Sequence, residues 1–183
     1  MLISLPHVIE LASRKKILFR EMTADDLDAI LMIENSANAS PWSVGDFINS
    51  IGSSHQTLVA EAVSESSPKI EKDNANKKLG IGGEILAFAV FSVGGGEAEV
   101  LNIAVAKESR KQGIAKSILN YFIESVAGKI DNLFLEVRKS NRAAIALYDE
   151  IGFNQVGLRS NYYPKSDASS EREDALIFAY TII

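Results

Sequence analysis

Hydrophobic and polar residues alternate along several short segments of the chain and recur at helical spacing along others. Alternation, or an apolar run of strand length, predicts strands at 17–22, 56–63, 84–93, 97–106, 132–138, 153–163 and 173–182. Helical spacing predicts helices at 24–37, within 41–51, from Ile114 to Val126 and at 141–151. We expect residues 1–16 to be an N-terminal extension that precedes the domain, with a short helix as the alternative.

The order of these elements indicates the fold class. One strand, two helices, three strands, a helix, a strand, a helix and two strands predict a single α+β domain over residues 17–183. We expect a mostly antiparallel sheet with helices packed on it, and parallel pairing wherever a helix lies between two strands. Residues 64–83 are rich in Ser, Lys, Asn and Gly and poor in large apolar side chains, so they predict a long flexible loop.

Composition narrows the class of protein. Of the 183 residues, 46% are hydrophobic and 23% are charged, as in soluble globular proteins. No apolar run approaches the roughly 20 residues that span a bilayer. The first sixteen residues lack an early basic region, and Pro6, His7 and Glu10 interrupt their apolar stretch, so we expect no signal peptide. These features predict a cytoplasmic protein without a membrane segment.

The charge of the chain and its few metal-binding residues argue against three further classes of protein: disulfide-bonded, metal-binding and nucleic-acid-binding proteins. The chain has no cysteine, which rules out disulfides and thiolate ligands, and its two histidines, His7 and His55, lie far apart in sequence. We therefore expect no metal. The net charge of −5 argues against nucleic-acid binding, which needs a basic surface. It suits a cationic partner, although the same charge also serves solubility alone.

One segment, "RKQGIAK" (110–116), stands where a predicted strand gives way to a predicted helix. Arg110, Lys111 and Lys116 supply positive charge, while Gly113 and Ala115 keep the turn thin. The first N–H groups of a helix have no acceptor within the helix, so they can bind an anion. The segment therefore fits a pyrophosphate site. A plain turn before an amphipathic helix is the alternative.

The wider stretch "LNIAVAKESRKQGIAKSIL" (101–119) is similar to the acetyl-CoA-binding motif of the GNAT superfamily of N-acetyltransferases. That motif is an apolar strand followed by [QR]-x-x-G-x-[GA] at the start of a helix, and Arg110, Gly113 and Ala115 occupy its defining positions. The resemblance runs from about residue 17 to the C-terminus. Within the superfamily, "SPWS" (40–43), "LEVRKSN" (135–141), "NYYP" (161–164) and "REDALIFA" (172–179) resemble the RimI group of ribosomal-protein alanine N-acetyltransferases.

The resemblance implies a sheet with helices on both faces and two neighbouring strands splayed apart, so that the pantetheine of acetyl-CoA lies between them. It also implies that an N–H near Val105 hydrogen-bonds the thioester oxygen. From the residues alone, the alternative is that "NIAV" (102–105) is a buried strand of the core and that Asn141 caps the helix that follows it. The resemblance assigns cofactor contacts to Ile103, Ala104, Val105, Arg110, Lys111, Gln112, Gly113, Ile114, Ala115, Lys116 and Asn141.

The resemblance assigns proton transfer to Glu136 and Tyr148. An ammonium cannot attack a thioester, so the amine must first lose a proton, and the departing thiolate must gain one. Alternation in "NLFLEVR" sets Glu136 on the face opposite Leu135, where it would act as base. Tyr148 would then be the acid. The alternatives from the residues alone are a surface ion pair of Glu136 with Arg138 and a core-packed tyrosine.

These expectations point to transfer of acetyl to the α-amine of an N-terminal alanine on a small-subunit ribosomal protein. Other protein N-termini, a lysine or a small amine are alternative acceptors, and a non-catalytic acyl-CoA-binding module is a third hypothesis. Trp42 and "NYY" (161–163) are candidates for contact with the peptide. Acidic residues near the C-terminus are further candidates for attracting a cationic N-terminus: Glu171, Glu173 and Asp174.

Overall fold

The computed structural model describes residues 2–63, 83–164 and 171–182. The predicted elements form in the predicted order, and the predicted flexible loop lies outside the described residues except for Gly83. The helices are α1 (Leu27–Ala37), α2 (Val44–Ile51), α3 (Ile114–Val126) and α4 (Arg142–Ile151). The strands are β1 (His7–Glu10), β2 (Lys16–Arg20), β3 (Gln56–Ala62), β4 (Ile85–Gly94), β5 (Glu97–Val105), β6 (Asn132–Arg138), β7 (Asn154–Tyr163) and β8 (Glu173–Thr181).

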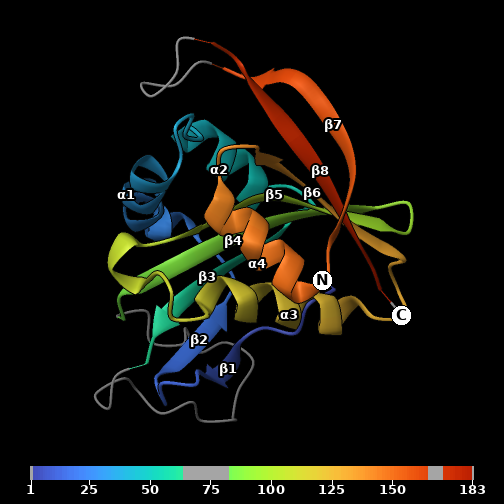
Figure 1. Cartoon of the computed structure of the whole chain (residues 1–183). Coiled ribbons are helices and arrows are strands. Elements are labelled where there is room, and N and C mark those ends of the chain that lie inside the picture. Colours follow the sequence, from blue (N-terminus) through green and yellow to red (C-terminus); the bar gives the residue numbers. More distant parts are fainter. Residues whose placement is uncertain (1, 64–82, 165–170, 183) are drawn as a thin grey trace.

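The eight strands form one sheet in the order β1-β2-β3-β4-β5-β6-β8-β7 (Figure 1). Every neighbouring pair is antiparallel except β5 and β6, which are parallel. The single helix α3 joins these two strands, and one helix returns the chain to the end of the sheet where the first strand began. The mostly antiparallel α+β class predicted from the sequence is therefore confirmed.

The expectation that every intervening helix gives a parallel pair is wrong for β2 and β3. Two helices, α1 and α2, lie between these strands, yet the strands pair antiparallel, with Ile17 opposite Ala62. The second helix brings the chain back to the end of the sheet that β2 has just left. Strand β7 also follows a helix, but β8 lies between it and β6.

The N-terminal segment adds a strand to the edge of the sheet, and the described residues 2–16 contain no helix. Strand β1 pairs antiparallel with β2, from His7 opposite Phe19 to Glu10 opposite Lys16. Ile3 and Leu11, which flank β1, are both buried in the main hydrophobic core. The alternative of a short helix in this segment is therefore wrong, because an edge strand with apolar flanks buries more of it against the sheet.

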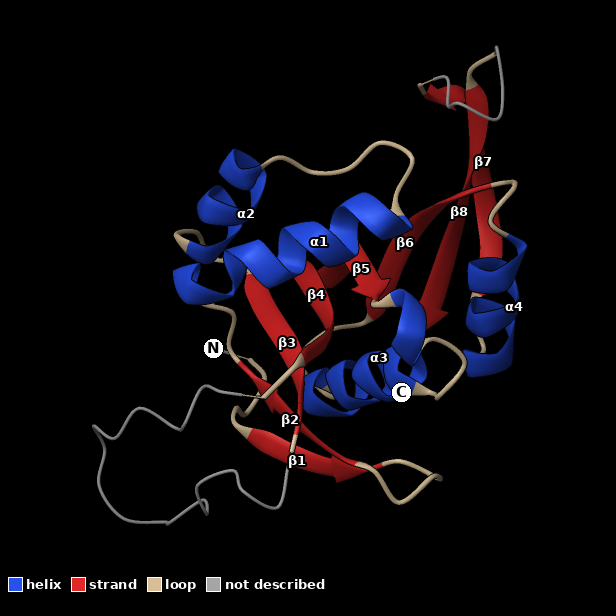
Figure 2. Ribbon diagram, turned by 90° about the vertical axis from the view of Figure 1, so that its left-hand side faces the viewer, coloured by secondary structure: helices blue, strands red, loops and turns tan. Residues whose placement is uncertain are grey.

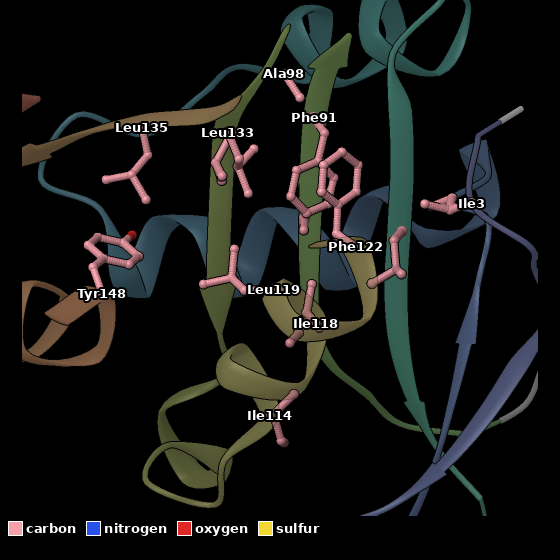
Figure 3. Close-up of a cluster of buried hydrophobic side chains, with 14 of the residues drawn as sticks. Ile3, Phe91, Ala98, Ile114, Ile118, Leu119, Phe122, Leu133, Leu135 and Tyr148 are labelled. Atoms are coloured by element: carbon pink, nitrogen blue, oxygen red, sulfur yellow. The ribbon is translucent and has the colours of Figure 1, made fainter. Parts of the chain in front are cut away.

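Helices cover both faces of the sheet, with α1 and α2 on one side and α3 and α4 on the other (Figure 2). The larger core lies beneath α3 and α4, and its central contact is Phe91 of β4 stacked on Phe122 of α3, with ring centroids 3.8 Å apart (Figure 3). The smaller core lies beneath α1 and α2 and includes Ile30, Phe47 and Phe88.

A buried ion cluster ties the start of α1 to the sheet. Arg20 of β2 lies 2.7 Å from Asp26 and 2.6 Å from Glu61 of β3, and all three side chains are buried. Burial alone would raise the pKa of Asp26, but hydrogen bonds from Arg20 and Thr23 lower it below its ordinary value. Asp26 therefore supplies charge-assisted hydrogen-bond acceptors to a buried cluster of one cation and two carboxylates.

We expect Asp26→Asn to lower the free energy of unfolding by about 3 kcal/mol at pH 7, because an amide cannot accept all the charge-assisted hydrogen bonds that Arg20 and Thr23 donate to the carboxylate, although Arg20 keeps its pair with Glu61. The pKa of Asp26 is depressed in the folded state, so its contribution is present above pH ~4 and is lost as the pH falls through the folded-state value. The deficit of the variant should therefore shrink in acid. Urea unfolding at several pH values measures it, and exposed Asp25→Asn is the control.

Candidate functional site

The sheet opens between β5 and β6. These strands pair over only four positions, from Glu97 opposite Asn132 to Val100 opposite Leu135, although β5 continues to Val105 and β6 to Arg138. A bulge interrupts the pairing of β5 with β4 at the same level, and Leu101 is its extra residue. A bulge bends its strand and increases the local twist. Beyond Val100, one edge of β5 is therefore left without a partner strand.

The residues predicted to contact the pantetheine lie on this open stretch of β5. Ile103, Ala104 and Val105 stand opposite Ala89, Phe88 and Ala87 of β4. Ala104 is buried beneath α1, while Ile103 and Val105 pack against the core beneath α3. Their side chains are thus core, and the side of β5 turned toward β6 offers backbone groups to an extended ligand.

The turn that leads from β5 into α3 presents free backbone donors. Lys111 and Gly113 adopt positive φ values of 61° and 83°, and Gly113 is the N-cap of α3. The first bond of the helix runs from Ser117 N–H to the Gly113 carbonyl. Within the described part of the chain, the N–H groups of residues 111–116 have no hydrogen-bond acceptor. This cluster of donors at a helix N-terminus suits a pyrophosphate.

Three side chains of the same turn bind the protein itself. Arg110 donates from Nε to the Val105 carbonyl at 3.1 Å, and Gln112 donates to the Glu108 carbonyl at 3.2 Å. Lys116 pairs with Glu150 of α4 at 2.8 Å, although both side chains are largely exposed. These contacts brace the turn, so the backbone supplies most of the donors. The side chain of Ile114 is part of the main core, and Ala115 is half-buried.

Asn141 caps α4. Its Oδ1 atom accepts a hydrogen bond from Ala144 N–H at 3.2 Å, which is the capping role given above as the alternative. The capping bond uses only the side-chain oxygen, so the Nδ2 group is still able to donate to a ligand. One amide can serve both roles.

Tyr148 lies on the α3–α4 side of the sheet, with its ring in the core and its hydroxyl turned toward β6 near Leu135 (Figure 3). Burial, and then the neighbouring Tyr163, raise the pKa of Tyr148 above the usual range of a phenol. Among the described residues, every fully buried polar side-chain atom has a hydrogen-bond partner, whereas this hydroxyl has none. The hydroxyl therefore reaches accessible space at the level where β5 and β6 separate.

Glu136 lies on the opposite face of β6, as the alternation in its strand predicts. Its carboxylate is 2.8 Å from Nε of Arg159 on β7 and accepts a hydrogen bond from the Tyr162 hydroxyl. The alternative surface pair of Glu136 with Arg138 is wrong, because Arg138 binds Glu173 at 3.2 Å and stacks on the ring of Tyr163. Strand β7 thus supplies the surroundings of Glu136.

A cavity of about 420 Å³ opens beside Glu136 on this face. The sequence pattern identified none of its other charged residues, because they come from separate strands. Glu99 and Glu97 reach the cavity from β5, and Arg159 reaches it from β7. Alternation along β5 would place both glutamates on the face of Glu136, and this is the signal that could have found them.

The candidates for peptide contact are distributed around this face. Trp42 is half-buried against Phe47, and its backbone N–H donates to the fully buried carboxylate of Glu34 at 2.8 Å. The same carboxylate accepts from Asn102 of β5, so the loop that carries Trp42 is fixed to the strand beside the gap. Trp42 therefore covers the core as well as lining this side of the molecule.

Two of the three acidic candidates near the C-terminus form ion pairs with other residues of the protein. Glu173 pairs with Arg138 and accepts from the Ser140 N–H, and Asp174 pairs with Lys139 at 3.4 Å. Their charges are thus used within the fold. The carboxylates that face the cavity are instead those of β5 and β6.

The splayed strands, the open donors before α3 and the acid and base candidates on opposite faces can be compared with known proteins. The profile of the Acetyltransferase (GNAT) family matches residues 55–153. The chain belongs to this family. GNAT acetyltransferases take their acetyl group from acetyl-CoA. The resemblance seen in the sequence is therefore confirmed at the level of the family.

The relatives of this GNAT chain extend over most of its length. It is 37% identical over 158 residues to the [ribosomal protein bS18]-alanine N-acetyltransferase of Escherichia coli, covering 86% of this chain and 92% of the relative. The crystal structure of that enzyme type from Escherichia coli superposes with a TM-score of 0.71 over 91% of this chain and 94% of the other, at 33% identity. Arabidopsis thaliana NAA60 in complex with acetyl-CoA shares the fold, with a TM-score of 0.68 at 22% identity, over 91% of this chain and 99% of the other.

The open edge and the turn fit acetyl-CoA in this GNAT domain. Residues 103–105 would bind the pantetheine through backbone groups, and the N–H groups of residues 111–116 would bind the pyrophosphate. No helix in the described ranges is long and apolar enough to cross a membrane. The same ranges contain no group of three His, Cys, Asp or Glu side chains arranged to hold a metal ion.

We expect Gly113→Ala to weaken acetyl-CoA binding at least tenfold, because its new Cβ would stand among the open donors of the turn. Gly128→Ala is the matched control, since both glycines have positive φ and neither Cβ would meet a protein atom within 4 Å. Both variants should lose about 1 kcal/mol of stability from the same backbone strain. Calorimetry should show weaker acetyl-CoA binding for Gly113→Ala alone, and equal affinities would contradict the assignment of this turn.

Proposed function

We propose that this GNAT enzyme transfers acetyl from acetyl-CoA to the α-amine of an N-terminal alanine on a small-subunit ribosomal protein. Its 37% identity to an alanine N-acetyltransferase of ribosomal protein bS18 supports this acceptor. A ribosomal acceptor also implies that the enzyme acts in the cytoplasm. The observation that carries the chemistry is the placement of Tyr148 and Glu136 on opposite faces of β6, where that strand leaves β5.

This placement separates the two proton transfers. Acetyl-CoA, bound in the gap, supplies the activated acetyl group. On the cavity face, Glu136 receives a proton from the ammonium of the acceptor, directly or through water, and leaves a neutral amine that can attack. On the other face, the Tyr148 hydroxyl donates a proton to the departing thiolate. The nitrogen loses its second proton after attack, and of the two protons that it has lost one is replaced on Tyr148 through solvent and the other leaves Glu136 for solvent, so that CoA is released as the thiol.

The surroundings of the two residues suit these roles. Burial raises the pKa of Tyr148, which keeps its proton in place until a strong base such as a thiolate forms beside it. A free α-amine has a pKa near ~8, against ~10.4 for a lysine side chain. Roughly a tenth of α-amines are therefore neutral at pH 7, so a carboxylate base is sufficient for an N-terminus.

The direct test compares three peptides with acetyl-CoA. The first begins with alanine, the second is the same peptide with a blocked N-terminus and an internal lysine, and the third lacks lysine. Release of CoA with the free N-terminus, independent of lysine, is the expected result. Transfer only to the lysine would replace the proposed acceptor, and binding of acetyl-CoA without transfer to any peptide would favour the non-catalytic alternative.

For Tyr148→Phe we expect kcat to fall about a hundredfold, the size typical of a lost general acid. Acetyl-CoA affinity should change less than about twofold, because the ring and its packing remain. Tyr180→Phe is the matched control, since Tyr180 lies at the edge of the same aromatic cluster on β8. Steady-state kinetics and calorimetry measure the two effects, and unchanged turnover in Tyr148→Phe would remove Tyr148 from the mechanism.

For Glu136→Gln we expect kcat/KM to fall about a hundredfold at pH 7, because the amine no longer has a base. The deficit should shrink as the pH rises from 7 to 9, since the α-amine then loses its proton to solvent at its own pKa of about 8. A pH–rate profile of both proteins measures this. A deficit that stays constant across that range would show that Glu136 does not act as the base.

A further inference from the structure

Glu99 is a second carboxylate on the acceptor side of the gap. It stands opposite Phe134 in the register of β5 and β6, two residues before Glu136, and it lines the same cavity. Adjacent strands lie about 4.8 Å apart, so residues on one face at this diagonal offset are neighbours. Glu99 therefore lies near Glu136 at the last paired positions before the strands separate.

The cavity carries more negative than positive charge. Three carboxylates line it, those of Glu97, Glu99 and Glu136, and Arg159 is its lining cation. Arg159 already forms an ion pair with Glu136, with 2.8 Å between Nε and Oε1. Among the described residues, no cation lies within ion-pairing distance of Glu99.

The electrostatic surroundings of Glu99 reflect this imbalance. Partial burial and then the charge of Glu136 raise the pKa of Glu99, and the charge of Arg159 opposes them only in part. Other groups that face the pair are the Tyr162 hydroxyl from β7, which binds Glu136, Ser92 of β4, which stands opposite Glu99, and the apolar side chains of Phe134 and Ile177. A cation entering the cavity would relieve the repulsion between the two carboxylates.

We propose that Glu99 binds the protonated α-amine of the acceptor and holds it beside Glu136, at the mouth of the gap between β5 and β6. The inference rests on the proposed function and adds a specific recognition residue to it. Glu99 accepts N–H hydrogen bonds from the ammonium, while Glu136 takes the proton. Glu97 lies two residues nearer the closed end of the gap, opposite Asn132, so the reacting nitrogen is out of its reach.

The test separates recognition of charge from general electrostatic attraction. Two ligands are titrated into the full chain in the presence of CoA, so that no transfer occurs: an alanine-starting peptide, and its isostere in which a hydroxyl replaces the α-amine. The proteins are wild type, Glu99→Gln and the matched control Glu97→Gln, which removes the same charge from the same strand and cavity.

We expect Glu99→Gln to weaken binding of the amine peptide about tenfold, as for a lost charge-assisted hydrogen bond, and to leave the hydroxyl isostere unchanged. Glu97→Gln should change either affinity less than twofold. In turnover, Glu99→Gln should raise KM for the peptide while KM for acetyl-CoA stays the same. A merely structural role would not separate the two ligands in this way.

Three results would each overturn the role of Glu99. The first is an equal loss in Glu99→Gln and Glu97→Gln, and the second is an equal loss for both ligands. The third is a wild-type protein that binds the hydroxyl isostere as tightly as the amine. These outcomes differ from failure of the proposed function, in which wild type would bind acetyl-CoA yet transfer no acetyl group to the alanine peptide.

Discussion

The site depends on the point at which β5 and β6 stop pairing. Sheet hydrogen bonds are satisfied along the first four positions of this parallel pair and then end, although both strands continue. The bulge at Leu101 bends β5 at that level, so the loss of pairing is built into the strand and is not a frayed end. An unpaired strand edge can pair with another extended chain, and at this edge the partner that we propose is the extended pantetheine of acetyl-CoA.

This gap also sets where chemistry can take place. Side chains of one strand alternate between the two faces of the sheet, so Leu135 and Glu136 point to opposite sides at the mouth of the gap. The core side receives Tyr148 from α4, and the other side opens on the charged cavity. A thioester placed between them would have its leaving group and its attacking amine on different sides, each near a different titratable residue.

Contacts elsewhere in the fold fix the elements that surround the gap between β5 and β6. Glu34 fixes the loop of Trp42 to Asn102 on β5, and the cluster of Arg20, Asp26 and Glu61 fixes the start of α1 to the sheet. At the other edge, β7 departs twice from regular pairing with β8, and Asn161 adopts a positive φ. Arg159 and Tyr162 lie over Glu136 in this irregular part of β7, so β7 contributes to the site although β8 lies between it and β6 in the sheet.

The sequence by itself determined the elements, their order, the α+β class and the turn before α3, because these follow from local periodicity and from the Gly113 motif. It also set Glu136 on the face opposite Leu135, since alternation needs only a single strand. Only the tertiary structure decided that β2 and β3 pair antiparallel, that residues 7–10 join the sheet, and that Glu136 pairs with Arg159 and not Arg138. Glu99 became visible in the same way. Each of these depends on which strands become neighbours, and strand order is fixed by long-range packing that no local pattern records.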